Sequence, residues 1–175
     1  GDRSFFALYG PVMGYEMRQV RPDEWRRSRE LRLAALKDPV SSVAFVRTYE
    51  EEAAFADEVW QQRASGVGAQ QFVAEDENGV WTGSLVVLVE PDESLSIVGV
   101  YLRPEVRGTG LAEKLFGAAL EWVWERVDRV QLWVHEGNPR AQAFYARLGF
   151  TRTGKTMPFP LDETQNEYEM ELLRP

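Results

Sequence analysis

The sequence predicts a mixed α/β fold built on a central sheet of about seven strands. The first observation is a run of three consecutive strand patterns, at 70–76, 80–90 and 95–102, joined by short turns. The second is a helical pattern at 110–126 followed by a strand at 129–135, which together with strand 95–102 can form a right-handed βαβ unit. A chain of 175 residues fits one domain by length.

Two helices are expected before the strand run. A short strand at 15–20 is followed by Pro22, a residue suited to a helix start, and by a helical pattern that ends before Pro39. A second helix is predicted over 49–64, with acidic residues at its start and a basic residue near its end. The segment "SGVG" at 65–68 breaks it.

Turn and cap residues define the later elements. Asn78-Gly79 predicts a hairpin between the first two strands of the run. The segment 138–149 reads as a capped helix, with Asn138 as N-cap, Pro139 at the first position and Gly149 at the end. Two closing strands follow, at 150–156 and 166–173.

Composition excludes several classes of function. The chain has no Cys and a single His, His135, so disulfides, a thiolate nucleophile and a protein-built zinc centre are not expected, and we predict no metal. The formal net charge of −8 disfavours nucleic acid as a partner. No apolar run is long enough to span a bilayer, so no membrane partner and a cytoplasmic location are expected.

The domain boundaries follow from the first residues. The segment 1–12 is a poor signal peptide, and its first residue is Gly rather than Met. We therefore expect residues 1–12 to be an N-terminal arm or a cloning remnant, and residues 13–175 to form a single domain.

The string "VRGTGLAEKLF" places Gly108 and Gly110 between a strand and a helix. Bare backbone at a helix N-terminus can bind phosphate oxygens, and Arg107 adds a cation. A plain strand-to-helix turn that needs glycine dihedrals is the structural alternative. A Walker loop is absent, and the dinucleotide fingerprint matches only in part because Glu113 occupies its third glycine position.

Two blocks, Arg107-x-x-Gly110-x-Ala112 and the segment from Asn138 to Phe150, together resemble the GNAT family of N-acetyltransferases. The first is the family's acetyl-CoA signature, in the form Arg107-x-x-Gly110-x-Ala112 behind a strand that ends before Pro104. The second is "NPRAQAFYARLGF", which is similar to the family's Asn-x-x-Ala-x-x-x-Tyr-x-x-x-Gly-Phe segment. Its matching residues are Asn138, Ala141, Tyr145, Gly149 and Phe150.

The resemblance implies a GNAT-type, mostly antiparallel sheet with helices on both faces and a parallel βαβ unit at the cofactor site. It implies that the pantetheine arm of acetyl-CoA pairs with Val100, Tyr101 and Leu102. Asn138 would contact the same arm, and a homodimer would be typical of the family. The pyrophosphate would rest on the N–H groups of Arg107, Gly108, Thr109, Gly110, Leu111 and Ala112.

The catalytic groups are an acid and a base. Tyr145 is the candidate general acid, because a phenol can donate to the leaving thiolate. The base is left open, since the family often uses a Glu near the fourth strand and that strand here has no carboxylate inside it. The candidates are Glu75, Glu93, His135 and Glu136.

Acceptor selection is expected from the segments 38–49 and 157–162. Their aromatic residues Phe45, Tyr49 and Phe159 could line a pocket, although packing is the favoured interpretation. The predicted function is transfer of an acetyl group from acetyl-CoA to a primary amine. The alternative is a noncatalytic acyl-CoA-binding or regulatory module on the same fold, and a dinucleotide-binding oxidoreductase ranks third.

Overall fold

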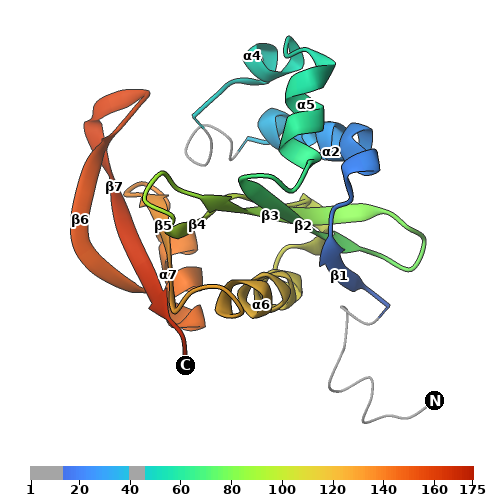
Figure 1. Ribbon diagram of the computed structural model, residues 1–175. Helices are drawn as coiled ribbons and strands as arrows, with labels where there is room; N and C mark the ends of the chain where they lie inside the picture. Colours follow the sequence, from blue (N-terminus) through green and yellow to red (C-terminus); the bar gives the residue numbers. More distant parts are fainter. Residues whose placement is uncertain (1–13, 40–45) are drawn as a thin grey trace.

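A single seven-stranded sheet forms the centre of the computed structural model, which describes residues 14–39 and 46–175 (Figure 1). The strand order is β1-β2-β3-β4-β5-β7-β6. The predicted arm over residues 1–12 lies outside the described residues. The strands are β1 (Glu16–Gln19), β2 (Ala69–Glu75), β3 (Trp81–Val89), β4 (Leu95–Leu102), β5 (Arg129–His135), β6 (Thr151–Phe159) and β7 (Asp162–Leu173).

The helices lie on both faces of this sheet, as predicted. In Figure 1, α2, α4 and α5 lie on one face and α6 and α7 on the other. None of the helices among the described residues is both long and apolar enough to cross a membrane. The helices are α2 (Trp25–Lys37), α4 (Tyr49–Ala53), α5 (Asp57–Ala64), α6 (Leu111–Trp124) and α7 (Pro139–Leu148), with short 3₁₀ turns η2 (Pro22–Glu24) and η3 (Pro104–Val106).

The pairing of the strands confirms a mostly antiparallel sheet with one parallel pair. All neighbours are antiparallel except β4 and β5, which join the two ends of the predicted βαβ unit. That parallel pairing is short, because only Leu95↔Val130 and Ser96↔Gln131 are in register. Beyond Ser96 the two strands separate, and the backbone of β4 is free to pair with another partner.

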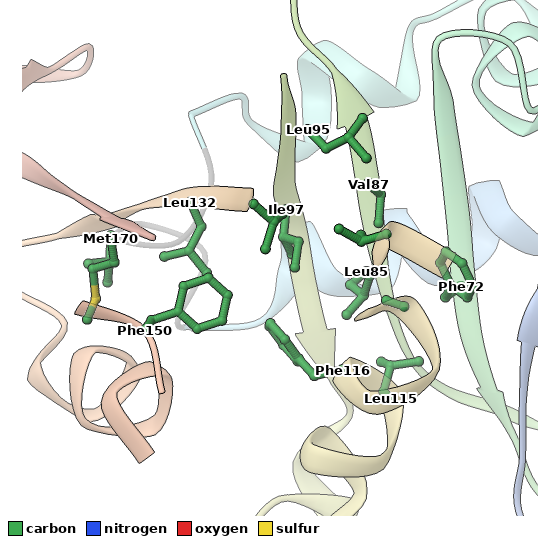
Figure 2. Packing of buried hydrophobic residues seen from close by; sticks show 14 residues of the cluster. Phe72, Leu85, Val87, Leu95, Ile97, Leu115, Phe116, Leu132, Phe150 and Met170 are labelled. Atoms are coloured by element: carbon green, nitrogen blue, oxygen red, sulfur yellow. The ribbon is translucent and has the colours of Figure 1, made fainter. Parts of the chain in front are cut away.

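The two faces of the sheet have separate cores. Phe116 of α6 is fully buried and packs among strand residues such as Leu85 and Leu132 (Figure 2). On the other face, Leu31 of α2 and Trp60 of α5 pack over β2 and β3. Burial of these apolar side chains holds both helix layers to the sheet.

The predicted helix over 49–64 is wrong as a single element. It divides into α4 and α5, because Ala56 adopts an extended conformation at φ −64° and ψ 157°. The break lets Phe55 turn back onto Trp60, with ring centroids 6.1 Å apart. It also keeps the fully buried Glu52 in ion pairs with Arg32 and Arg63, at 2.9 and 2.6 Å. The aromatic contact and the two ion pairs are tertiary interactions, and together they override the helical pattern of the segment.

The closing hairpin is longer than predicted. β6 extends to Phe159 and β7 begins at Asp162, so most of the segment 157–162 is strand. Phe159 is buried and contacts the ring of His135 edge-on, with centroids 4.6 Å apart. Tyr49 packs against the core beneath α2, and Phe45 lies outside the described residues.

A buried carboxylate links β1 to the start of α2. Glu24 accepts hydrogen bonds from Arg18 Nη1 and Nη2 at 2.8 and 2.7 Å, and from the backbone N–H of Arg21 at 2.9 Å. These bonds, chiefly those from Arg18, lower the pKa of Glu24 from 4.5 to about 2. The folded state therefore gains stability that is present above pH 4.5 and is lost as the pH falls toward 2.

Replacing Glu24 with Gln should remove this pH-dependent stability. We expect the free energy of unfolding at pH 7 to fall by about 2 kcal/mol, and the difference from the wild type to shrink as the pH falls below 4. Urea unfolding at pH 7 and pH 3 measures both quantities. Asp23→Asn is the matched control, because that side chain is 83% exposed and should change neither value. An unchanged stability of Glu24→Gln at pH 7 would contradict the prediction.

Candidate active site

The glycine turn before α6 leaves the helix N-terminus open. Gly108 and Gly110 have φ of +74° and +88°, values that favour glycine, and Gly110 is the N-cap. No side chain caps the helix. Chain neighbours aside, a Cβ at either glycine would meet no atom of the described residues within 4 Å, so crowding by neighbouring groups does not explain why glycine stands there. The N–H groups of the first turn are therefore accessible to an anion.

Arg107 is held by the protein rather than left free. Its Nη2 donates to Asp38 Oδ2 at 2.7 Å, and its Nε donates to the carbonyl oxygen of Leu102 at 3.1 Å. The Tyr101 hydroxyl also donates to Asp38 Oδ2, at 3.4 Å. Arg107 thus ties the end of β4 to the end of α2, and its charge is balanced by a buried carboxylate. This pairing could not be seen in the local string, because Asp38 lies 69 positions away in the sequence.

Helix α7 carries two exposed arginines near the glycine turn. Asn138 is its N-cap, and its Oδ1 accepts a hydrogen bond from the N–H of Ala141 at 3.1 Å. Arg140 and Arg147 are exposed and line the same cavity as Gly108 and Gly110. These two arginines were not among the predicted site residues, although they lie within the motif segment.

A β-bulge changes the side-chain alternation of β4 beside this helix. Gly99 and Val100 together stand opposite the single residue Leu85, and Gly99 has φ +62°. As a result Val100 packs on the α6 face, whereas Tyr101 joins the core beneath α2. The bulge lies where β4 leaves β5.

A cavity of about 500 Å³ runs through the gap between the separated ends of β4 and β5. On the α7 side it is lined by Phe144 and Tyr145, and on the other face of the sheet by Trp133 and His135. It therefore connects the two faces. Nine of the eleven residues predicted to bind the cofactor line it, and Thr109 and Leu111 do not. The nine are Val100, Tyr101, Leu102, Arg107, Gly108, Gly110, Ala112, Asn138 and Tyr145.

Tyr145 lines the cavity and packs against buried aromatic rings behind it. Its ring centroid is 5.9 Å from that of Phe116 and 6.0 Å from that of Phe150. Burial raises the pKa of the Tyr145 phenol from 10 to about 12. The phenol therefore keeps its proton at neutral pH and can act as a hydrogen-bond donor toward a group in the cavity.

The structure separates the four base candidates. Glu75 accepts hydrogen bonds from Arg18 and Trp81, at 2.8 and 2.7 Å, and lies at the far end of the sheet. Glu93 is exposed in the hairpin between β3 and β4, with φ +70°. Glu136 accepts from the backbone N–H of Asn166 at 2.9 Å. Only His135, among these four, lines the cavity.

A carboxylate that sequence reasoning missed also lines the cavity. Glu167 of β7 is the cross-strand partner of His135, and burial raises the pKa of its carboxyl above the ordinary value. It lies within the predicted strand 166–173. Neither its strand neighbour nor the cavity is visible in the local sequence, because β5 and β7 are brought together by the sheet.

Comparisons with known proteins agree with this geometry. The model of the acetyltransferase (GNAT) family matches residues 16–150. An uncharacterised N-acetyltransferase of Mycobacterium bovis is 30% identical over 137 residues, which is 75% of this chain and 81% of that protein. Among solved structures, spermidine N-acetyltransferase from Vibrio cholerae in complex with CoA and spermine has a TM-score of 0.67 and 19% identity, covering 92% of this chain and 96% of that one.

Other relatives are longer than the part that matches. An uncharacterised N-acetyltransferase of Methanocaldococcus jannaschii is 38% identical over 80 residues, 45% of this chain but 33% of that protein. Mycothiol acetyltransferase of Salinispora arenicola is 45% identical over 51 residues, 28% of this chain but 17% of that protein. The match thus spans well under two thirds of the length of either relative.

Proposed function

This chain belongs to the acetyltransferase (GNAT) family, and from that membership we propose that it transfers an acetyl group from acetyl-CoA to a primary amine. The proposed transfer is direct, with acetyl-CoA and the amine bound together in a ternary complex. The acceptor can be a small molecule, a peptide or a protein. The observation that carries the proposal is the cavity, because it connects the glycine turn on one face of the sheet with an opening on the other face.

The α7 side of the cavity fits the cofactor. The N–H groups from Gly108 to Ala112 suit the pyrophosphate, whereas the N–H of Arg107 already donates to the carbonyl oxygen of Pro104 at 3.3 Å. Arg140 and Arg147 suit further phosphate oxygens. The free edge of β4 after Ser96 can pair with the pantetheine amides along Val100 to Leu102. Asn138 caps α7 through its Oδ1, and this cap is by itself a sufficient reason for an Asn at this position. The side-chain NH₂ group is left to contact the pantetheine arm.

We assign Tyr145 to the leaving thiolate. Full transfer of a proton from a phenol of pKa about 12 to a thiolate whose thiol has an ordinary pKa of about 8.5 is uphill by about 5 kcal/mol. The main contribution of Tyr145 is therefore a strong hydrogen bond that stabilises negative charge on sulfur as the C–S bond breaks. The phenol transfers its proton fully to sulfur only as it receives a proton from the nitrogen of the new amide.

Calorimetric titration with acetyl-CoA, with NADH as the comparison ligand, tests the proposal first. We expect acetyl-CoA to bind with micromolar affinity and NADH not to bind. A screen of primary amines that includes spermidine should then release free thiol from acetyl-CoA. Binding of NADH in preference to acetyl-CoA would contradict the proposed cofactor. Binding of acetyl-CoA without transfer to any amine would instead indicate the noncatalytic acyl-CoA-binding module.

A further inference from the structure

His135 is held in one orientation at the end of β5. The side chain is 3% exposed, and its Nδ1 accepts a hydrogen bond from the backbone N–H of Gly137 at 2.8 Å. The ring also contacts Phe159 edge-on. A Cβ at Gly137 would lie 3.0 Å from Nδ1 and 3.1 Å from Cε1, so the glycine lets its backbone approach the ring closely.

This hydrogen bond decides where the imidazole carries its proton. A ring nitrogen that accepts a hydrogen bond uses its lone pair and carries no hydrogen, so neutral His135 has its proton on Nε2. Nε2 has no hydrogen-bond partner among the described residues, and the side chain lines the cavity. The neutral ring therefore presents a donor to the cavity and has no free lone pair with which to accept a proton.

Glu167 is the cross-strand neighbour of His135. Residues paired across antiparallel strands point to the same face, so Glu167 and His135 share the face opposite α6 and α7. On its other side, Glu167 is paired with the uncharged Met157 of β6. The only other carboxylate lining the cavity among the described residues is Glu113, which lies in the first turn of α6 beside the glycine turn.

The environment of Glu167 suits a base. The carboxylate is half-buried, and this burial raises its pKa, although the nearby His135 opposes the rise. A carboxylate with a raised pKa is a better proton acceptor near neutral pH. Glu167 lies on the face of the sheet opposite Tyr145. The gap between β4 and β5, where the thioester would lie, therefore separates the proposed acid from the proposed base.

We propose that Glu167 is the catalytic base that removes a proton from the acceptor ammonium, and that His135 serves as a hydrogen-bond donor beside it. This inference rests on the proposed function. The ammonium R–NH₃⁺ gives one proton to Glu167, and the free lone pair of nitrogen forms the C–N bond as the C–S bond breaks. The acylated nitrogen then loses a second proton to Tyr145, as Tyr145 gives its own proton to the leaving sulfur. Glu167 releases the first proton to solvent.

Glu167→Gln tests the role of the carboxylate with an amine that the wild type acetylates. We expect kcat to fall about 100-fold, with little change in the affinity for acetyl-CoA. In the wild type, kcat should fall as the pH drops and Glu167 becomes protonated, and this acid limb should disappear in Glu167→Gln. Glu163→Gln is the matched control, because Glu163 is exposed on the same strand and does not line the cavity. His135→Gln, which keeps an N–H donor, should retain the acid limb.

The outcomes separate the two levels of the proposal. A wild type that acetylates no amine would overturn the proposed function, and this inference with it. A wild type that is active, with Glu167→Gln showing a raised KM but an unchanged kcat and acid limb, would overturn the inference alone. Loss of the acid limb in His135→Gln but not in Glu167→Gln would assign the base to His135 instead.

A spectroscopic test needs no acceptor. The chain contains one His, so ¹⁵N NMR of the wild type gives a single pair of imidazole signals. We expect a protonated Nε2 and an unprotonated Nδ1 in the neutral form. A neutral ring protonated on Nδ1, with Nε2 free to accept a proton, would overturn the assignment of His135 as a donor.

Discussion

Replacing Gly110 with Asp should weaken the binding of acetyl-CoA by at least about 100-fold. Gly110 is the N-cap of α6, and a Cβ there would meet no atom of the described residues within 4 Å apart from its chain neighbours. The side chain would project to where the pyrophosphate is proposed to lie. A carboxylate at that point would place like charges side by side. Calorimetric titration of the variant with acetyl-CoA measures the loss.

The matched control is Gly110→Asn. Asn has nearly the same shape as Asp, no charge, and a tolerance for the left-handed backbone that φ +88° requires. We expect Asn to weaken binding less than about tenfold, so the difference between the two variants isolates the charge. Equal affinities of Asp and Asn would mean that the glycine turn does not hold the phosphates. Thermal unfolding of both variants measures any loss of stability that the side chain causes at this backbone conformation.

Tyr145→Phe should lower kcat by about 100- to 1000-fold while leaving the affinity for acetyl-CoA within about threefold of the wild type. The substitution removes only the hydroxyl, and the aromatic contacts with Phe116 and Phe150 remain. The expected loss is that of one hydrogen bond to a developing negative charge in a water-poor site. Thiol release at saturating amine and acetyl-CoA measures kcat.

The control for this variant is Tyr168→Phe, which removes a hydroxyl that bonds to Glu136 at 3.4 Å and that does not line the cavity. We expect its kcat to match that of the wild type. A Tyr145→Phe enzyme with full activity would show that the thiolate leaves without help from this phenol. Equal losses in the two variants would indicate a general effect on the sheet rather than on the leaving group.

Most elements of the fold could be predicted locally. Cap residues such as Asn138, Pro139 and Gly149 define α7 to within a residue, because each acts on the backbone next to it. Strands β4 and β5 have the predicted bounds of 95–102 and 129–135. The helix predicted over 49–64 was wrong because Glu52 and Phe55 turn inward toward partners on α2 and α5, and no local pattern encodes those contacts.

The sequence by itself determined the family and the glycine turn, because each motif lies within one local unit of structure. Arg107 and Gly110 belong to one strand-to-helix turn, and Asn138 and Tyr145 belong to one capped helix. Only the tertiary structure decided which charges are paired and which carboxylates line the cavity. Asp38 neutralises Arg107 from the end of another helix, and Glu167 meets His135 across two strands that lie far apart in the chain. The physical reason is range: caps and turns act between neighbouring residues, whereas the charge and accessibility of a side chain depend on whatever the fold packs against it.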